Sequence, residues 1–381
     1  MKIAMIGHKR IPSREGGAEI VVEEISIRLA AQGHTVHVYN RKGNYVHGSM
    51  NEYHNIKEYK GTRILQIPTI PKKGLDALVY SFFAVVRALF GRYDVIHFHA
   101  EGPGVMILIT RLFGIRSVST IHGLDWKTAK WGKLAKKYLM FGEKVIARYA
   151  NEIIVLSRNN QKYFLDNYKR NTNFIPNGVN KPSTHKASII TEKYGLHGQD
   201  YLFFLGRIVQ GKGLEYLIDA YAQVKTDKKL VISGGSSHST EYEKSIKERA
   251  ISDSRIIMTG FVQGELLDEL FSNCSVYILP SDSEGMSISL LEAMSYGRPC
   301  LVSDISENTE VVESYAVTFK KSSTADLREK MEHLINEGFV RYTPDEISAF
   351  ILGKYNWDQV VNSHIKLYEY NKGDANHESK N

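Results

Sequence analysis

The sequence predicts an α/β fold made of two doubly wound domains. Short apolar strands alternate with helix-length segments in both halves of the 381-residue chain, a pattern typical of parallel sheets covered by helices. The alternation pauses once, over residues 175–200, where Pro, Gly, Asn and Ser accumulate as in a hinge. We therefore expect an N-terminal domain over 1–180, a C-terminal domain over 181–356 and a ligand in the cleft between them.

The first domain is predicted to begin with a strand at Lys2–Ile6 and a helix over Ala18–Gln32. That helix carries apolar side chains at helical spacing on one face. Further strands are expected at Thr35–Tyr39, Val95–Phe98, Ser117–Ile121 and Glu152–Leu156. The apolar stretch Ala77–Phe90 contains Arg87 and is shorter than the ~20 residues that span a bilayer, so we expect a buried helix there.

The second domain repeats the alternation. Its strands are expected at Tyr201–Leu205, Leu230–Ser233, Ile256–Met258, Val276–Leu279 and Cys300–Ser303. A helix is expected from about Ser287, and a last helix, over about 357–370, is expected to pack back on the first domain.

Composition and charge limit the class of protein. The chain is 43% hydrophobic and 24% charged, which is ordinary for a globular protein, and its two cysteines, Cys274 and Cys300, stand in apolar surroundings that argue against disulfides or zinc. No secretory leader is visible at the start, so we predict a cytoplasmic protein.

A basic block with interleaved aromatic residues, at 125–150, indicates a partner. It carries Lys127, Lys130, Lys133, Lys136, Lys137, Lys144 and Arg148 together with Trp126, Trp131, Tyr138 and Phe141, in a chain of net charge +7. Such a helix suits the anionic inner face of the cell membrane as a peripheral contact. A solvated helix face is the plainer interpretation, and nucleic acid is disfavoured because no known binding motif accompanies the charge.

Two glutamates, Glu284 and Glu292, stand eight positions apart around the start of the helix predicted from about Ser287. Helical rise puts their backbones roughly 12 Å apart, which favours a long ligand touched at both ends over a glycosidase pair. The amides of Gly285, Met286 and Ser287 lie between them at a helix N-terminus, which suits anions and sugar oxygens.

The turn after the second domain's first strand, Gly206 to Gly213, matches most of a P-loop. Gly213 breaks the match because a P-loop needs a hydroxyl there to hold magnesium. Arg207 and Lys212 can instead hold a diphosphate without any metal. The acidic triplet 282–284 is typical of a divalent-metal site, but these two cations make the metal redundant, so we predict no metal and no other cofactor.

In the first domain, Gly16 and Gly17 follow a strand and precede a helix, where backbone amides can approach a phosphate or an acceptor closely. The spacing from Gly7 is too long for a dinucleotide fingerprint. His97 and His99 lie on one side of a strand like a metal pair, but lack an apparent third ligand and are interpreted as packing or cleft lining.

These segments together resemble a known family. "GRIVQGKGLEYLIDA", "PSDSEGMSISLLEAMSYGRPCLVSD" and "ENTEVVE", with "GGAEIVVEEISIRLAAQGHTVHVY", "DVIHFHAEGP", "STIHGLDW" and "IPNGV" before them, resemble the retaining glycosyltransferases of the family 4 type, which have the GT-B fold. The subgroup it resembles assembles bacterial capsule, exopolysaccharide or lipopolysaccharide. The resemblance covers nearly the whole chain and is specific through the E-x7-E pair taken together with the upstream Arg and Lys.

The resemblance implies a role for each matched residue. Glu292 would accept the ribose hydroxyls of a nucleotide-sugar donor, Glu284 would reach the transferred sugar, and Arg207 with Lys212 would hold the diphosphate. His122 would stand beside the sugar. The implied activity is retaining transfer of a hexose to a glycan or lipid-linked acceptor; a GT-B nucleotide-sugar epimerase is the nearest alternative and a P-loop-like nucleotide hydrolase a more distant one.

Overall fold

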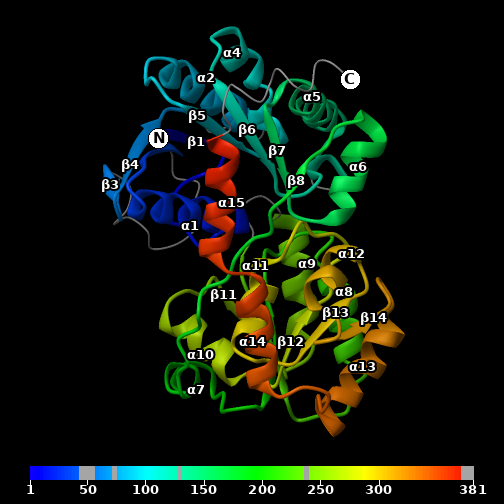
Figure 1. Cartoon of the computed structure of the whole chain (residues 1–381). Helices are drawn as coiled ribbons and strands as arrows, with labels where there is room; N and C mark the ends of the chain where they lie inside the picture. Colours follow the sequence, from blue (N-terminus) through cyan, green and yellow to red (C-terminus); the bar gives the residue numbers. More distant parts are fainter. Residues whose placement is uncertain (43–55, 71–74, 128–130, 236–239, 370–381) are drawn as a thin grey trace.

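The structure, a computed structural model, describes residues 1–42, 56–70, 75–127, 131–235 and 240–369. It contains two sheets with helices on their faces, one in each half of the chain (Figure 1). The predicted α/β class with two doubly wound, Rossmann-like domains is confirmed.

The N-terminal sheet has the order β3-β4-β2-β1-β5-β6-β7-β8. Its strands are β1 (Lys2–Ile6), β2 (Thr35–Arg41), β3 (Glu58–Tyr59), β4 (Thr62–Ile67), β5 (Val95–His99), β6 (Arg116–Ile121), β7 (Glu152–Val155) and β8 (Asn173–Phe174). All pairings run parallel except that of β3 with β4. Its helices are α1 (Gly17–Ala31), α2 (Leu75–Leu89), α3 (Glu101–Gly104), α4 (Ile107–Leu112), α5 (Lys133–Tyr149) and α6 (Arg158–Tyr168), with a short 3-10 turn at Asp125–Lys127.

The C-terminal sheet has the order β11-β10-β9-β12-β13-β14 and is parallel throughout. Its strands are β9 (Tyr201–Leu205), β10 (Lys229–Ser233), β11 (Ile256–Gly260), β12 (Val276–Leu279), β13 (Cys300–Ser303) and β14 (Val317–Phe319). The remaining helices are α7 (Ile189–Tyr194), α8 (Leu214–Tyr221), α9 (Thr240–Ile251), α10 (Glu265–Asn273), α11 (Ile288–Ser295), α12 (Ser306–Val312), α13 (Thr324–Glu337), α14 (Pro344–Lys354) and α15 (Trp357–Tyr368).

The expectation of a buried helix near residues 77–90 is half wrong. Tyr80, Ala84 and Val85 of α2 are fully buried against the sheet, but Phe82 and Phe83 are about half exposed. A helix lying on one face of a sheet buries a single stripe of side chains, so a helix that is apolar all round leaves apolar side chains outside.

The last helix, α15, returns from the second domain to the first and lies against α1 (Figure 1). The hydroxyl of Tyr368 and Nδ1 of His97 share a hydrogen bond of 2.7 Å, and Arg116 donates to the Leu367 carbonyl at 2.8 Å. The chain passes between the domains twice, near Val179 and near Tyr355. These two connections lie side by side, and the Val179 amide donates to the Tyr355 carbonyl at 2.8 Å. Helix α15 is thus built into the first domain.

We predict that Tyr368→Phe lowers the free energy of unfolding by about 1–3 kcal/mol, because a buried His97 nitrogen loses its partner. Urea unfolding measures the change. Exposed Asn362→Ala on the same helix is the control and is expected to cost less than about 0.5 kcal/mol. Equal costs in the two variants would contradict the role of this bond in docking α15.

Candidate active site

The two domains meet through their backbones at Gly285. A Cβ atom built at position 285 would lie 1.6 Å from the carbonyl oxygen of His122 and 3.2 Å from the amide nitrogen of Gly123. The loop after β6 therefore touches the loop before α11, and only glycine fits at 285. This contact brings the predicted residue His122 next to the segment that carries Glu284.

Glu284 and Lys212 form a close ion pair, and both side chains are largely buried. The predicted diphosphate cation and the predicted sugar-binding carboxylate are thus brought together by the loops after β9 and β12. Arg207, from the same turn as Lys212, is exposed and has no partner among the described residues. Its guanidinium is therefore accessible from solvent.

Position 213 explains why the P-loop match stops there. Gly213 has a φ of +70°, and a Cβ would lie 2.1 Å from the Pro280 carbonyl oxygen and 2.3 Å from the Tyr216 hydroxyl. A serine or threonine is excluded by these contacts. The turn therefore lacks the hydroxyl with which P-loops bind magnesium, which removes the basis of the hydrolase alternative.

The acidic triplet 282–284 is divided among internal contacts. Asp282 accepts hydrogen bonds from the hydroxyls of Tyr216, at 3.1 Å, and Ser322, at 2.7 Å, whereas Glu284 faces Lys212. No group of three or more potential metal-ligating side chains is found in the described parts of the chain. The residues present do not form a ready set of metal ligands.

Glu292 lies on α11 and pairs with a residue that sequence reasoning missed. Nη1 of Arg14, from the loop before α1, donates to the Glu292 carboxylate at 3.1 Å across the domain interface. Burial raises the pKa of Glu292, and the Arg14 charge opposes that rise. A cavity of about 170 Å³ opens here, lined by Arg14, Asn180, Lys181, Asp268, Glu292 and Trp357 among others. The sequence pointed to this loop only through its glycines, Gly16 and Gly17. It did not predict the pairing of Arg14 with Glu292, because the two residues are 278 positions apart.

The start of α11 is fixed to both domains. Ser287 caps the helix, its hydroxyl accepting from the Leu290 amide at 3.4 Å. Met286 is held by Asn177, whose side-chain amide donates to the Met286 carbonyl at 3.2 Å. Gly285, Met286 and Ser287 therefore form a rigid turn between the two glutamates.

Gly16 and Gly17 begin α1 opposite this turn. A Cβ on Gly17 would contact the Ile288 side chain at 3.6 Å, so the first turns of α1 and α11 face each other. A Cβ on Gly16 would come within 2.3 Å of the Glu19 carboxylate. Glu19 accepts from the Lys9 amide at 3.0 Å, which fixes the loop leading to these glycines.

His122 is one of several neighbouring histidines. Its Nε2 shares a hydrogen bond of 3.0 Å with Nδ1 of His99, and the two rings are stacked. His97 lies 4.2 Å from His99 between ring centroids and bonds to Tyr368 and Thr120. Burial lowers the pKa of His122 to about 4 and keeps His97 and His99 neutral. His97 and His99 therefore position the ring of His122 and belong to the packing of the cleft.

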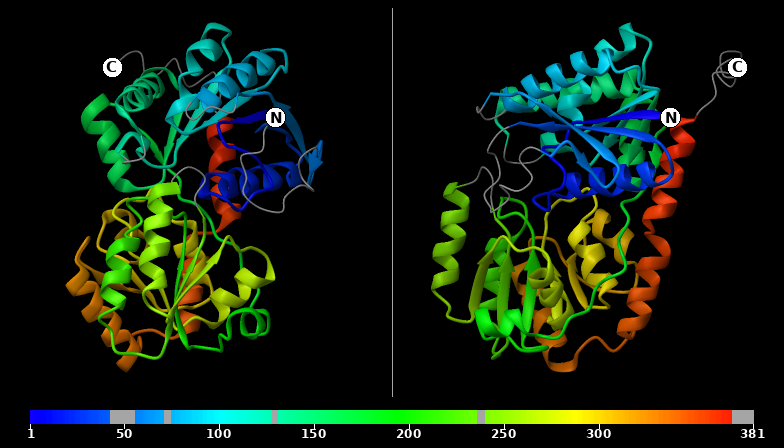
Figure 2. Two further views of the ribbon diagram at one scale, coloured as in Figure 1. Left: turned by 180° about the vertical axis from the view of Figure 1, so that it is seen from behind. Right: turned by 90° about the vertical axis from the view of Figure 1, so that its left-hand side faces the viewer.

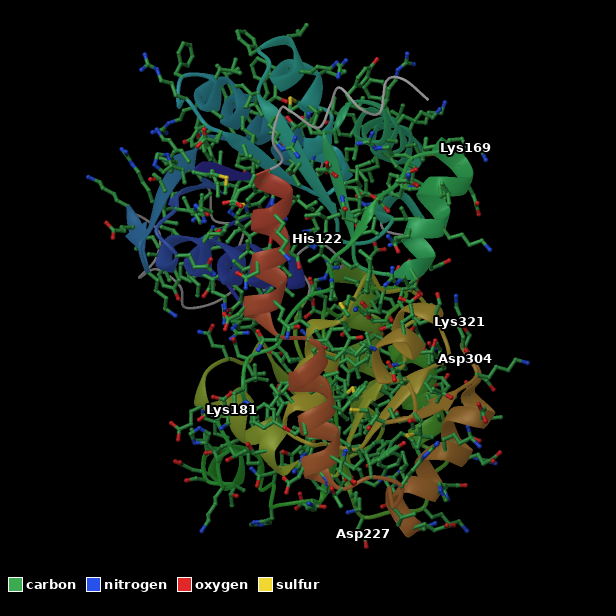
Figure 3. All side chains as sticks on the ribbon, viewed as in Figure 1. His122, Lys169, Lys181, Asp227, Asp304 and Lys321 are labelled. Atoms are coloured by element: carbon green, nitrogen blue, oxygen red, sulfur yellow. The ribbon has the colours of Figure 1, made fainter. Side chains whose placement is uncertain are left out.

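The basic block lies on α5, and its side chains are divided between two faces. Trp126 donates its indole N–H to Glu143 at 2.7 Å and Tyr138 donates to the Gly102 carbonyl at 2.9 Å, so these aromatics serve the interior. The outer side of α5 exposes Lys133, Leu134, Lys137, Met140, Phe141, Lys144 and Arg148, whereas Lys136 is half-buried. Lys130 lies outside the described residues. Figure 3 shows the side chains as sticks on the ribbon, in the view of Figure 1.

Comparison with known proteins agrees with this geometry. The family model "Glycosyltransferase Family 4" matches residues 15–181, and "Glycosyl transferases group 1" matches residues 188–367. These two matches together span nearly the whole chain and agree with its two parallel sheets, so the chain is a GT-B glycosyltransferase. It is built from a family 4 domain followed by a group 1 domain.

Individual relatives are distant and cover the chain to different extents. The O-antigen chain mannosyltransferase C of Escherichia coli is 24% identical over 97% of this chain and 98% of its own. The UDP-Gal:alpha-D-GlcNAc-diphosphoundecaprenol alpha-1,3-galactosyltransferase of Escherichia coli is 26% identical over 58% of this chain and 61% of its own.

Two solved structures share the fold. Sucrose-phosphate synthase from Thermosynechococcus elongatus has a TM-score of 0.81 at 22% identity and covers 96% of this chain and 98% of its own. Anabaena HepE in complex with UDP-glucose has a TM-score of 0.76 at 17% identity, with the same coverage. Over the described residues, the chain has no helix with the length and apolar character to cross a bilayer.

The buried histidines predict acid sensitivity. In the unfolded chain histidine takes up a proton near pH 6.5, whereas burial lowers the pKa of His8, His122 and His364 to about 4 in the folded protein. Between these values the unfolded state holds more protons, so stability must fall as the pH falls from about 6.5 towards 4. Urea unfolding at several pH values is expected to show uptake of more than one proton.

His364→Gln should reduce that proton uptake by about one, since His364 is fully within the core. His333→Gln, at an exposed position of α13, serves as the control. A free energy of unfolding that does not change between pH 7 and pH 5 would show that these histidines are not neutral in the folded protein.

Proposed function

We propose that this glycosyltransferase moves a hexose or related sugar, with retention of anomeric configuration, from a nucleotide-diphosphate sugar to a glycan or lipid-linked acceptor. The observation that supports the proposal is the contact of the two domains at Gly285, beside which Lys212 pairs with Glu284 and, further along α11, Arg14 pairs with Glu292. In this proposal Glu292 binds the ribose, Arg207 and Lys212 bind the diphosphate, and Glu284 binds the transferred sugar.

In the empty site each carboxylate already has a cation, Arg14 for Glu292 and Lys212 for Glu284. Donor binding then exchanges partners: Lys212 turns to the diphosphate, and the ribose hydroxyls replace Arg14 on Glu292. A charged carboxylate accepts hydroxyl hydrogen bonds more strongly than a neutral group does. Among the described residues next to Glu284, none is an evident nucleophile. Retention of the sugar's configuration therefore fits a front-face route, in which the acceptor attacks from the side on which the diphosphate leaves.

In that route the bond from the anomeric carbon to the diphosphate oxygen breaks, and the bond to the acceptor oxygen forms on the same face. The departing phosphate oxygen takes the acceptor proton. Arg207 and Lys212 stabilise the negative charge that grows on the diphosphate, and neutral His122 donates or accepts a hydrogen bond at the sugar. No metal is needed, because the two cations supply the compensating charge.

The acceptor is proposed to be a growing cell-surface glycan of the capsule, exopolysaccharide or lipopolysaccharide kind, presented on lipid at the cytoplasmic side of the membrane. Support comes from similar proteins, since the names of two relatives state O-antigen and diphosphoundecaprenol acceptors for those enzymes. The exposed lysines of α5 add the charge with which a peripheral protein approaches an anionic membrane.

Glu292→Gln is expected to weaken donor binding by about 1–3 kcal/mol, because a neutral amide accepts the ribose hydroxyls less strongly. Arg14→Ala is the paired variant and is expected to leave binding equal or slightly tighter, since it removes a competitor of the ribose. Calorimetry with a panel of UDP, GDP, dTDP and ADP sugars measures both. Unchanged affinity in Glu292→Gln would refute the ribose role.

Arg207→Ala and Lys212→Ala are each expected to lower turnover at least tenfold, because they act on charge that grows as the sugar leaves. Arg207→Ala should leave the melting temperature nearly unchanged, whereas Lys212→Ala should also lower it, because the largely buried Glu284 loses its partner. Lys228→Ala, at a lysine outside the cleft, is the control.

Activity is expected to survive EDTA, and NMR of the product should show the anomeric configuration of the donor. A strict need for magnesium would restore a metal role for Asp282 and Glu284. Release of an epimerised sugar would favour the epimerase.

A further inference from the structure

Five large apolar side chains stand outside the core on the outer side of two neighbouring helices. We call them the α2–α4 face; its members are Phe82, Phe83, Phe90, Leu112 and Phe113. Phe90 is 85% exposed, Leu112 84% and Phe113 63%. Single exposed apolar side chains are ordinary, but a cluster of this size marks an interaction surface.

The face lies at one end of the molecule. Helices α2 and α4 contact each other and cover the part of the N-terminal domain that is farthest from the C-terminal domain (Figures 1 and 2). Phe90 follows the last residue of α2, and Phe113 follows the last residue of α4. Both therefore lie at the C-terminal ends of their helices.

The local sequence gives α2 two apolar sides. Tyr80, Ala84 and Val85 fill the core, while the remaining side carries phenylalanines, with Arg87 as the one charged side chain in its second half. A surface helix ordinarily has charged residues opposite its core stripe. The exposed side of α2 therefore has the apolar composition of a surface that binds a partner.

The exposed charges that flank the face along the chain are mostly cationic. Arg87, Arg92 and Arg111 are exposed, and Asp94 is the one exposed carboxylate among residues 75–116. In the segment from residue 75 to residue 116, Asp76 is buried and pairs with Arg41, and Glu101 is fully buried. Asp94 accepts a hydrogen bond of 2.6 Å from the Lys2 amide. An apolar centre with a cationic edge complements an anionic lipid surface.

We propose that the α2–α4 face inserts into an anionic bilayer, with Phe90, Leu112 and Phe113 at the boundary between headgroups and acyl chains. The lysines of α5, which packs against α4, lie beside it and attract the same surface from the side. The proposal extends the acceptor part of the proposed function by naming the surface that meets the lipid. Donor binding does not depend on it.

Insertion can be followed with a fluorophore whose emission shifts to the blue in apolar surroundings. Phe90→Cys and Phe113→Cys are labelled selectively, because the native cysteines Cys274 and Cys300 are buried. Vesicles of phosphatidylglycerol and phosphatidylcholine are expected to shift both labels. Val340→Cys, 89% exposed on the C-terminal domain, is the control and is expected not to respond. Absence of a shift at 90 and 113, or an equal shift at 340, overturns the proposal.

A second measurement uses unlabelled protein. Phe90→Ser combined with Phe113→Ser is expected to reduce vesicle flotation at least tenfold, with melting temperature and donor affinity unchanged, whereas Val340→Ser has no effect. Full flotation of the double variant overturns the proposal. Light scattering that shows a dimer, lost in the same variant, together with no flotation of the parent would identify a second copy as the true occupant. Loss of donor affinity in Glu292→Gln tests the donor role separately.

Discussion

The backbone contact between Gly285 and the loop of His122 is the constraint on which the site depends. It sets the distance between the first domain and the start of α11 and requires a residue without a side chain at one position. On one side of this contact stands the histidine held by His99; on the other stand Glu284 and the cap of α11. A larger residue at 285 would push the two domains apart, moving His122 away from Glu284 and Arg14 away from Glu292.

Charge in the cleft is balanced before any ligand arrives. Glu292 and Arg14 pair across the domains, and Glu284 and Lys212 pair within the second. The Arg14 side chain is 41% exposed, so this pair is worth about 0–1 kcal/mol and can be replaced by a ligand at small cost. Both carboxylates are thus compensated by a cation, whereas the side chain of Arg207 is exposed to solvent.

Much of the fold followed from the sequence because apolar runs in buried parallel strands are distinctive; β1, β9, β12 and β13 have the expected ends. The strand Thr62–Ile67 escaped notice because charged and polar residues interrupt it. The pairing of Lys212 with Glu284 was predictable, since both follow strands of one sheet. Arg14 was not, because a contact between residues 278 positions apart depends on how the domains sit together. Which side of α2 faces solvent likewise depends on its packing against the sheet.

The return of α15 to the first domain has a consequence for the order in which the protein is made. Synthesis proceeds from the N-terminus, and domains generally fold as units as they emerge. One of the two hydrogen-bond partners of His97 is Tyr368, in the last described helix. The first domain therefore lacks the packing of α15 until residue 368 has left the ribosome. The second domain, complete earlier, is finished before the first. His97, on which His99 packs, therefore gains this support only after α15 has been synthesised.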